Sequence, residues 1–239
     1  MSDPATSIWG VIPAAGIGRR MQSAIPKQYL SLHGKTILQH SCERLLDTRR
    51  VHGLVVAVRE DDRHWDAVQQ ALQSRYRKPV IRVIGGAERA DSVCNALLAL
   101  QAHVGNSDNC LVLVHDAVRP CVRSADIETL IETAMRAGDD GALLAMPVRD
   151  TMKRSAGDGR IRATVPREHL WHALTPQCFP LSALLQALQQ ALQNSLVVTD
   201  EASAMEQAGL SPHLVHGADD NIKITRPDDL PLAEWSLRT

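Results

Sequence analysis

IWGVIPAAGIGRRMQSAIPK, residues 8–27, is the stretch of this sequence that decides the fold. It opens with an apolar run, residues 8–12, that is typical of a buried strand. The run ends in a loop of small residues, 13–18, where glycines permit a sharp turn and alanines leave room for a ligand beside the backbone. Backbone N–H groups in such a loop can bind oxyanions, and the two arginines and the lysine that follow suit a polyphosphate. The stretch predicts a strand followed by a phosphate-binding loop.

Two familiar nucleotide loops do not fit this stretch. The spacing G-x-x-x-x-G-K-[ST] is absent, and Gly16-x-Gly18 is followed by Met21 where the dinucleotide fingerprint has a third glycine. A plain strand-to-helix turn with surface arginines stays open, because short glycine motifs recur by chance. The rest of the chain has to separate these interpretations.

Composition narrows the class of ligand. The chain has 239 residues, a formal net charge of -1 and only 3% aromatic residues. A nearly neutral chain lacks the broad positive field of a general nucleic-acid binder, and few aromatic rings leave no stacking platform for single strands. The sequence therefore predicts no nucleic-acid partner and favours a small anionic substrate bound by local clusters of charge.

The cysteines and the N-terminus indicate the compartment. Five cysteines are scattered without a C-x-x-C pair, which is typical of reduced thiols in a cytosolic protein. The N-terminal MSDPATS has no basic or apolar leader character, and no apolar run reaches membrane-spanning length. We expect a cytoplasmic protein with no membrane partner.

Strand and helix patterns alternate as far as residue 146. Strand patterns follow the first one at residues 53–58, 80–84, 110–115 and 142–146, and helical patterns fall at residues 36–46, 62–74, 88–100 and 125–137. This alternation predicts an α/β fold, a mostly parallel sheet with helices on both faces. Farther on, the patterns predict helices at residues 181–193 and from Thr199 or Asp200, an edge strand at 212–216, an extended segment at 221–225 and a terminal helix from Pro227. No linker is visible, so residues 1–239 are expected to form a single domain.

Chemistry-bearing loops follow three of these strands, at residues 13–20, 85–92 and 115–120. Ligands of such sheets bind beyond the carboxyl ends of the strands, so the three loops should share one site. Asp116 can bind a cation or substrate hydroxyls and Arg119 can neutralise an anion, although a structural ion pair between them stays open. Ser92 can contact a base or a phosphate at a helix start, or simply cap that helix. Pairs such as His169 and His172 lack a third ligand, so the metal ligands are unknown.

The alternation breaks between Pro147 and Pro166. A turn at residues 155–159 separates two short runs, and apolar residues alternate with polar ones at 161–165, which predicts a β-hairpin. An isolated hairpin with so little apolar surface is marginal in water. We therefore expect residues 148–167, approximately, to form a dimerisation arm, and a flexible surface excursion is the alternative.

Eight motifs, in order, resemble those of one family. They are PAAGIGRRM, PKQY, GGAERADSV, VHDAVRP, PVRDTMK, LWHALTPQ, TDEASA and DNIKITRP. They resemble the 2-C-methyl-D-erythritol 4-phosphate cytidylyltransferases of the non-mevalonate isoprenoid pathway, over nearly the whole chain. The resemblance implies a Rossmann-like homodimeric nucleotidyltransferase that joins CTP to a methylerythritol phosphate and releases pyrophosphate, with Mg²⁺ on the triphosphate.

The same resemblance implies roles for individual residues. Those that would act in catalysis are Arg20, Lys27, Arg167 and Lys223. Those that would hold CTP are Ala14, Ala15, Gly16, Gly86, Ser92 and Ala117. Those that would surround the sugar phosphate are Asp116, Arg119, Thr151 and Thr175, with Thr151 and Arg167 reaching into the neighbouring subunit's site. Ala87 departs from the family, where some members carry an acidic residue that can touch the base or ribose.

The expected chemistry needs no general base, because the substrate phosphate is already an anionic nucleophile. Arg20 and Lys27 would stabilise charge that builds on the α-phosphoryl oxygens, while Arg167 and Lys223 position the attacking phosphate. Two alternatives stay open. One is a cytidylyltransferase for another polyol phosphate such as ribitol 5-phosphate, and the other is a nucleotide-binding module without turnover.

Overall fold

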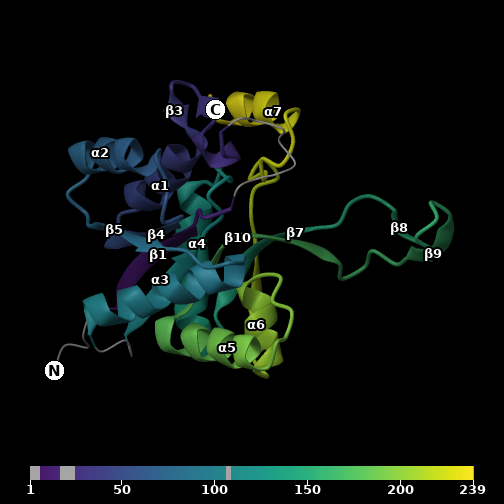
Figure 1. Ribbon diagram of the computed structural model, residues 1–239. Coiled ribbons are helices and arrows are strands. Elements are labelled where there is room, and N and C mark those ends of the chain that lie inside the picture. The colour runs from purple at the N-terminus through teal and green to yellow at the C-terminus, as the bar shows by residue number, and fades with distance from the viewer. Residues whose placement is uncertain (1–5, 17–24, 106–108, 239) are drawn as a thin grey trace.

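The computed structural model describes residues 6–16, 25–105 and 109–238. Its centre is a seven-stranded sheet in the order β11-β7-β10-β6-β1-β4-β5 (Figure 1). The strands are β1 (Ser7–Pro13), β4 (Gly53–Val58), β5 (Val80–Ile84), β6 (Cys110–Val114), β7 (Ala142–Pro147), β10 (Trp171–Pro180) and β11 (His213–His216). All neighbouring pairs are parallel except those made by β10. The predicted α/β fold with a mostly parallel sheet is confirmed, and the expected edge strand is β11.

Helices cover both faces of the sheet (Figure 1). One face packs against α1 (Ile37–Asp47), α2 (Trp65–Arg75) and α4 (Ser124–Ala137). The other packs against α3 (Arg89–Val104), α5 (Leu181–Gln193) and α6 (Glu201–Gln207). Smaller elements are the 3-10 turns η2 (Lys27–Tyr29) and η3 (Gly138–Asp140), the ribbon of β2 (Ser31–Leu32) and β3 (Lys35–Thr36), and the terminal helix α7 (Asp229–Ser236).

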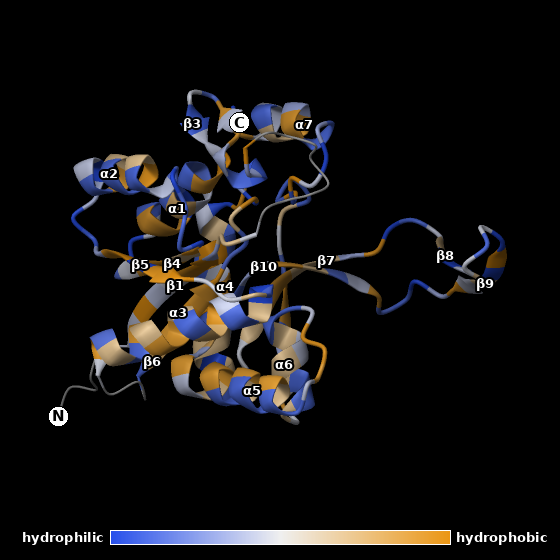
Figure 2. Ribbon diagram, in the orientation of Figure 1, coloured by the Kyte–Doolittle hydropathy of each residue, from blue (hydrophilic) through white to orange (hydrophobic). Residues whose placement is uncertain are grey.

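The central strands are apolar on both sides because both faces are covered. In β1, Ile8 and Ile12 join the core under α1, while Trp9 and Val11 join the core under α3. Gly10 lies between them, and a side chain there would meet Leu45 of α1. Figure 2 shows the resulting concentration of hydrophobic residues on the sheet. This burial explains why the apolar run at residues 8–12 does not alternate.

The strand β10 was absent from the sequence prediction. It runs antiparallel between β6 and β7, and its register shifts between Ala173 and Gln177, where three residues lie opposite one of β7. Pro176 falls in this shifted part, and a proline cannot donate to a sheet ladder. The bulge and the mixed polar and apolar residues hide the strand pattern, and burial between two strands stabilises it nevertheless.

The C-terminal segment differs slightly from its prediction. Residues 221–225 join no strand of the sheet, although Ile224 donates its backbone N–H to the oxygen of Val118 at 2.9 Å. The helix α7 begins at Asp229, two residues after the predicted start at Pro227. The Asp229 carboxylate accepts the backbone N–H groups of Thr225 at 2.7 Å and Arg226 at 2.8 Å, so a turn precedes the helix.

The predicted hairpin is present and projects from the end of the sheet where β7 stops (Figure 1). It consists of β8 (Met152–Ser155) and β9 (Ile161–Val165), which pair with each other and with no other strand of the described residues. No side chain from residue 148 to residue 167 is buried. The segments that join this arm to the sheet are mainly hydrophilic in Figure 2, with a short hydrophobic stretch on each. Its expected role in dimerisation remains a prediction.

The sequence also led us to expect reduced cysteines and no membrane-spanning segment. All five cysteines are buried free thiols. In the part of the chain that the structure describes, no helix has the length and apolar character that a membrane crossing requires.

Candidate active site

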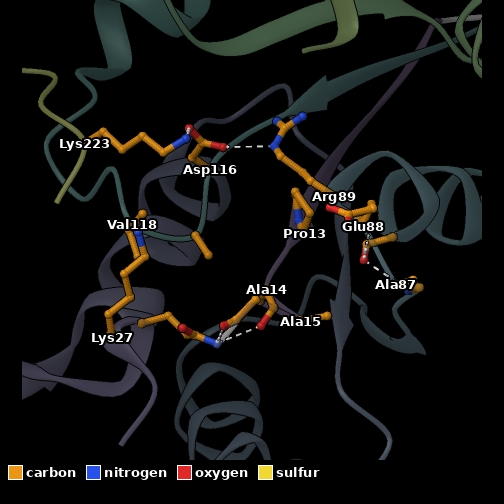
Figure 3. A pocket seen from close by; sticks show the side chains of 15 residues that line it. Pro13, Ala14, Ala15, Lys27, Ala87, Glu88, Arg89, Asp116, Val118 and Lys223 are labelled. Carbon is orange, nitrogen blue, oxygen red and sulfur yellow. Dashed lines mark hydrogen bonds and ion pairs between the residues drawn. The ribbon is translucent and has the colours of Figure 1, made fainter. Parts of the chain in front are cut away.

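A cavity of about 300 Å³ opens where β1, β5 and β6 end. The three loops that the sequence singled out all reach it, as predicted. It is lined by residues 13–16, 27–28, 86–89 and 116–118 together with Ser92 and Lys223. Figure 3 shows these side chains converging from segments that lie far apart in the sequence.

The first wall is the small-residue loop at residues 14–16. Its entry is fixed by the sheet, because the Ala14 N–H donates to the Ala57 oxygen at 2.7 Å. The side chain of Gln28, which is buried, donates to the backbone oxygens of Ala14 at 2.8 Å and Gly16 at 3.0 Å. No role for Gln28 follows from the sequence, where its only signal is its position beside Lys27 in PKQY. Gln28 sets the course of the loop backbone.

The second wall is the turn into α3. A Cβ on Gly86 would collide with the Asp91 side chain, so glycine is required there. The Gly86 N–H donates to Ser92 Oγ at 3.1 Å, and this hydroxyl donates to the Glu88 oxygen at 3.1 Å. The helix cap itself is a reciprocal pair made by Glu88 and Asp91. Ser92 is therefore not the cap; it ties the turn together and lines the cavity.

The third wall carries Asp116, whose side chain is buried at the end of β6. Three cations surround its carboxylate, and Figure 3 shows it between two of them. Lys223 Nζ lies 2.9 Å from Oδ2, Arg119 Nε lies 3.3 Å from Oδ2, and Arg89 Nε lies 3.2 Å from Oδ1. Burial alone would raise the pKa of Asp116, but the three cations outweigh it and hold that pKa well below its ordinary value. Asp116 is ionised at any physiological pH.

The ion pair that the sequence left open, Asp116 with Arg119, is present. Arg119 also donates from Nη1 to the Asn221 backbone oxygen at 2.7 Å, and its side chain does not line the cavity. Its guanidinium therefore supports Asp116 from behind. Arg89 and Glu201 were not predicted as site residues, although both lie in motifs quoted above. Arg89 donates to Glu201 Oε1 at 2.6 Å.

A buried hydrogen-bond chain fixes Thr175 behind Asp116. His115 is fully buried, and burial lowers its pKa to about 4, so its ring is neutral. Its Nε2 lies 2.9 Å from the Arg119 carbonyl oxygen, which can only accept, so Nε2 carries the proton. Thr175 Oγ1 then donates to His115 Nδ1 at 2.9 Å and accepts the Asp116 N–H at 3.0 Å. The Thr175 hydroxyl has no proton left for a ligand and can only accept.

Comparisons with known proteins agree with this geometry. The model of the family IspD, described as 2-C-methyl-D-erythritol 4-phosphate cytidylyltransferase, matches residues 8–239. The chain belongs to this family. It is a cytidylyltransferase of the non-mevalonate isoprenoid pathway, as the motifs implied.

Relatives match almost from end to end. A protein of Vibrio atlanticus described by the family's name is 52% identical over 237 residues, which cover 99% of this chain and 98% of that protein. A protein of Pseudomonas putida with the same description is 48% identical over 237 residues, covering 98% of this chain and 96% of the relative.

Solved structures match as well. The crystal structure of a 4-diphosphocytidyl-2C-methyl-D-erythritol synthase superposes with a TM-score of 0.84 at 35% identity, covering 98% of this chain and all of that one. The Francisella tularensis IspD structure gives 0.81 at 35% identity, with 96% and 99% covered.

The predicted site residues that the structure describes fall into three groups. The cavity is lined by Ala14, Ala15, Gly16, Lys27, Gly86, Ser92, Asp116, Ala117 and Lys223. Arg119 and Thr175 adjoin it through Asp116. Thr151 and Arg167 do not line the cavity of their own chain; both are exposed at the base of the arm, where Arg167 donates to the Arg149 backbone oxygen. Arg20 lies outside the described residues.

The described residues do not fit a metal site built from side chains. They contain no group of three or more His, Cys, Asp or Glu arranged to hold an ion. Divalent cations at nucleotide sites take carboxylate oxygens along with phosphates. Of the two carboxylates that line the cavity, Asp116 binds three cations and Glu88 takes part in the cap of α3.

Proposed function

We propose that this cavity joins CTP to 2-C-methyl-D-erythritol 4-phosphate and releases pyrophosphate, with the two phosphates bound on opposite walls. One observation carries the assignment of the walls. The small-residue loop at 14–16 and the cationic cluster around Asp116 share a single cavity, with Lys27 and Lys223 both lining it. A triphosphate suits the loop, and a phosphate that bears hydroxyl groups suits the cluster.

On the first wall, the loop at 14–16 would hold the CTP phosphates together with Lys27 and Arg20. The nucleoside would lie against Gly86, Ser92 and Ala117. Because Ala87 offers no carboxylate, cytosine recognition would fall to backbone groups of this turn. Gln28 supports the arrangement, since it holds the carbonyl oxygens of the phosphate loop in place.

On the second wall, Asp116 would accept a hydroxyl of the sugar phosphate, and Lys223 would bind its phosphate. Thr175 would contribute as an acceptor, since its proton is committed to His115. Arg119 would act through Asp116. These assignments place the carboxylate of Asp116 beside the ammonium group of Lys223. The carboxylate suits a hydroxyl group and the ammonium suits a phosphate, so the pair matches a polyol monophosphate better than an anion without hydroxyl groups.

The chemical step needs no proton acceptor from the protein. An oxygen of the sugar phosphate attacks the α-phosphorus of CTP, the bond from that phosphorus to the bridging oxygen breaks, and pyrophosphate leaves. Lys27 would stabilise charge on the α-phosphoryl oxygens, and Lys223 would hold the attacking phosphate in line. Mg²⁺ would arrive on the triphosphate, where it supplies further charge neutralisation.

The second subunit would complete the site. Thr151 and Arg167 are exposed and separate from their own cavity, which suits contact with the substrate phosphate bound by a partner. The arm at residues 148–167 would thus serve a homodimer. The chain would work in the cytoplasm as a single domain, residues 1–239, that carries this arm.

The test is a pyrophosphate-release assay with CTP and a panel of polyol phosphates. We expect release with 2-C-methyl-D-erythritol 4-phosphate and little with ribitol 5-phosphate, and less with ATP or GTP in place of CTP. An equal or reversed preference between the two polyol phosphates would overturn the substrate assignment. Tight CTP binding without turnover of any acceptor would favour a nucleotide-binding module instead.

A further inference from the structure

Glu201 is a carboxylate beside the cavity to which the proposed mechanism gives no task. It is the first residue of α6, and only 1% of its surface is exposed. Its two oxygens accept from both terminal nitrogens of Arg89, at 2.6 Å from Nη1 and 3.1 Å from Nη2. The remaining nitrogen, Nε, donates to Asp116 Oδ1 at 3.2 Å. Arg89 therefore bridges two buried carboxylates, and all three of its nitrogens are engaged.

The backbone around Glu201 is fixed by the strand β10. Asp200 caps α6 by accepting the Ser203 N–H at 3.0 Å, and the other oxygen of Asp200 accepts from Gln177 Nε2 at 2.9 Å. The amide oxygen of Gln177 accepts the Ala202 N–H at 2.8 Å. Gln177 is buried in the sheet, so Glu201 is held on both sides by a rigid element.

The bridge controls how many acceptor positions of Asp116 remain. Lys223 and Arg119 both contact Oδ2, whereas Arg89 Nε is the only donor to Oδ1 among the described residues. A carboxylate oxygen accepts two hydrogen bonds, so Oδ1 keeps one position, and Asp116 lines the cavity. An arginine released from Glu201 would turn its two-pronged fork toward Asp116, because that geometry is the stronger one. The free acceptor position on Asp116 Oδ1 would then be occupied by Arg89.

We infer that Glu201 is a positioning residue: it grips the fork of Arg89 so that Asp116 keeps one acceptor for a hydroxyl of the polyol phosphate. This inference rests on the proposed function of the Asp116 wall. Electrostatics alone predicts that loss of the Glu201 charge would strengthen substrate binding, whereas the positioning role predicts that it would weaken binding. The cluster of Arg89, Arg119 and Lys223 with two carboxylates has a charge of +1, and removing the charge of Glu201 would make it more attractive to an anionic substrate. The direction of the change in KM therefore separates geometry from charge.

The experiment compares Glu201→Gln with Glu43→Gln in steady-state kinetics. Glu43 is a matched control, because it is also buried and paired, to Lys35 at 2.6 Å and Arg75 at 3.5 Å, and neither partner lines the cavity. We expect Glu201→Gln to raise KM for the polyol phosphate on the order of 10- to 100-fold, with KM for CTP nearly unchanged. Glu43→Gln should leave both KM values unchanged, although both variants should lower the melting temperature.

A double-mutant comparison tests whether Glu201 acts through Arg89. In an Arg89→Gln background, Glu201→Gln should cause no further rise in KM. If Glu201→Gln does not fold, Glu201→Asp keeps the charge but is too short to grip the fork, and it should show the same selective rise.

Three results would overturn the inference: a KM for the polyol phosphate that falls or stays level, an equal rise in KM for CTP, or an undiminished effect of Glu201→Gln in the Arg89→Gln background. If the wild-type protein fails to turn over any polyol phosphate, the proposed function and this inference both fall. A wild-type protein that is active while Glu201→Gln behaves like Glu43→Gln contradicts the inference alone.

Discussion

The Asp116 wall and the arm are opposites in how the chain supports them. Asp116 is 6% exposed and is held by Arg89, Arg119 and Lys223, which come from three different segments. Ile161 in the arm is 68% exposed, and β8 and β9 pair only with each other. The charges of the wall are paired within its own chain, whereas the described residues leave apolar surface of the arm uncovered. One region holds charges in place, and we propose that the other packs against a partner subunit.

The side chains of the two regions are held in place by different kinds of contact. The wall depends on contacts across long sequence separations, and so its side chains are fixed before any ligand arrives. The arm depends on local pairing, such as that of Met152 with Val165. We therefore expect substitutions in the wall to lower the reaction rate or the stability of the fold. Substitutions in the arm should leave the stability of the isolated subunit unchanged.

The largest effect should come from Lys27→Ala. Lys27 lines the cavity, and Nζ donates to the Ile224 backbone oxygen at 3.2 Å, which keeps the charge near the phosphate loop. Removing one preorganised donor costs roughly 10²- to 10³-fold in rate. Steady-state kinetics should show kcat falling far more than KM for CTP rises. A change in KM alone would mean that Lys27 binds only the ground state.

The buried histidine behind the wall should make folding sensitive to acid. Burial lowers the pKa of His115 in the folded chain to about 4, from an ordinary value of 6.5, so the unfolded chain binds more protons between these pH values. Its contribution to stability is therefore complete above pH 6.5 and is lost as the pH falls toward 4. We expect wild type to lose roughly 2 kcal/mol from this residue between pH 7 and pH 5.

The control is His115→Gln, whose amide can still donate to the Arg119 carbonyl and accept from Thr175 but does not titrate. Urea unfolding at pH 7 and pH 5 should show a smaller loss of stability for this variant than for wild type. Equal losses in the two proteins would show that His115 is not the source of the acid sensitivity.

The smallest effect should come from Ile161→Ser in the arm. In dilute protein, where subunits separate, the free energy of unfolding should stay within about 0.5 kcal/mol of wild type because the side chain is exposed. The control is Ile131→Val in α4, a fully buried position where losing one methyl group costs about 1 kcal/mol. At higher concentration the wild-type melting temperature should rise and that of Ile161→Ser should rise less. A concentration-independent loss in Ile161→Ser would place the arm against its own chain.

Local patterns in the sequence were enough for much of the fold. The apolar run at residues 8–12 and the alternation that followed predicted the parallel part of the sheet, and the turn at 155–159 predicted the hairpin. The strand β10 escaped because Pro176 and a bulge interrupt its pattern, and only burial between β6 and β7 stabilises it. A strand that is stabilised mainly by contacts with neighbouring strands shows no clear strand pattern in its own sequence.

The same limit applies to the site. The loops and Asp116 follow strand ends, so their meeting could be predicted from topology. Arg89 and Glu201 are separated by 112 residues, and no periodicity relates them. His115 and Thr175 are 60 residues apart, and their hydrogen bond is visible only in the folded chain. Long-range partners that position other groups are what sequence reasoning missed.

Subunit exchange between two inactive variants tests whether the site is composed of residues from two chains. Lys27→Ala damages the cavity and Arg167→Ala damages the arm. In a mixed dimer, one site would carry both lesions, while the other would combine an intact Lys27 with an intact Arg167 from the second chain. Random exchange makes half of the dimers mixed, so roughly a quarter of the wild-type activity should return.

The control mixture pairs Lys27→Ala with the double variant Lys27→Ala/Arg167→Ala, which can form no intact site and should stay inactive. Native mass spectrometry verifies that exchange has occurred in both mixtures. Recovery near a quarter in the first mixture alone is the result that we expect. No recovery despite verified exchange would place Arg167 in the site of its own chain and would contradict a composite site.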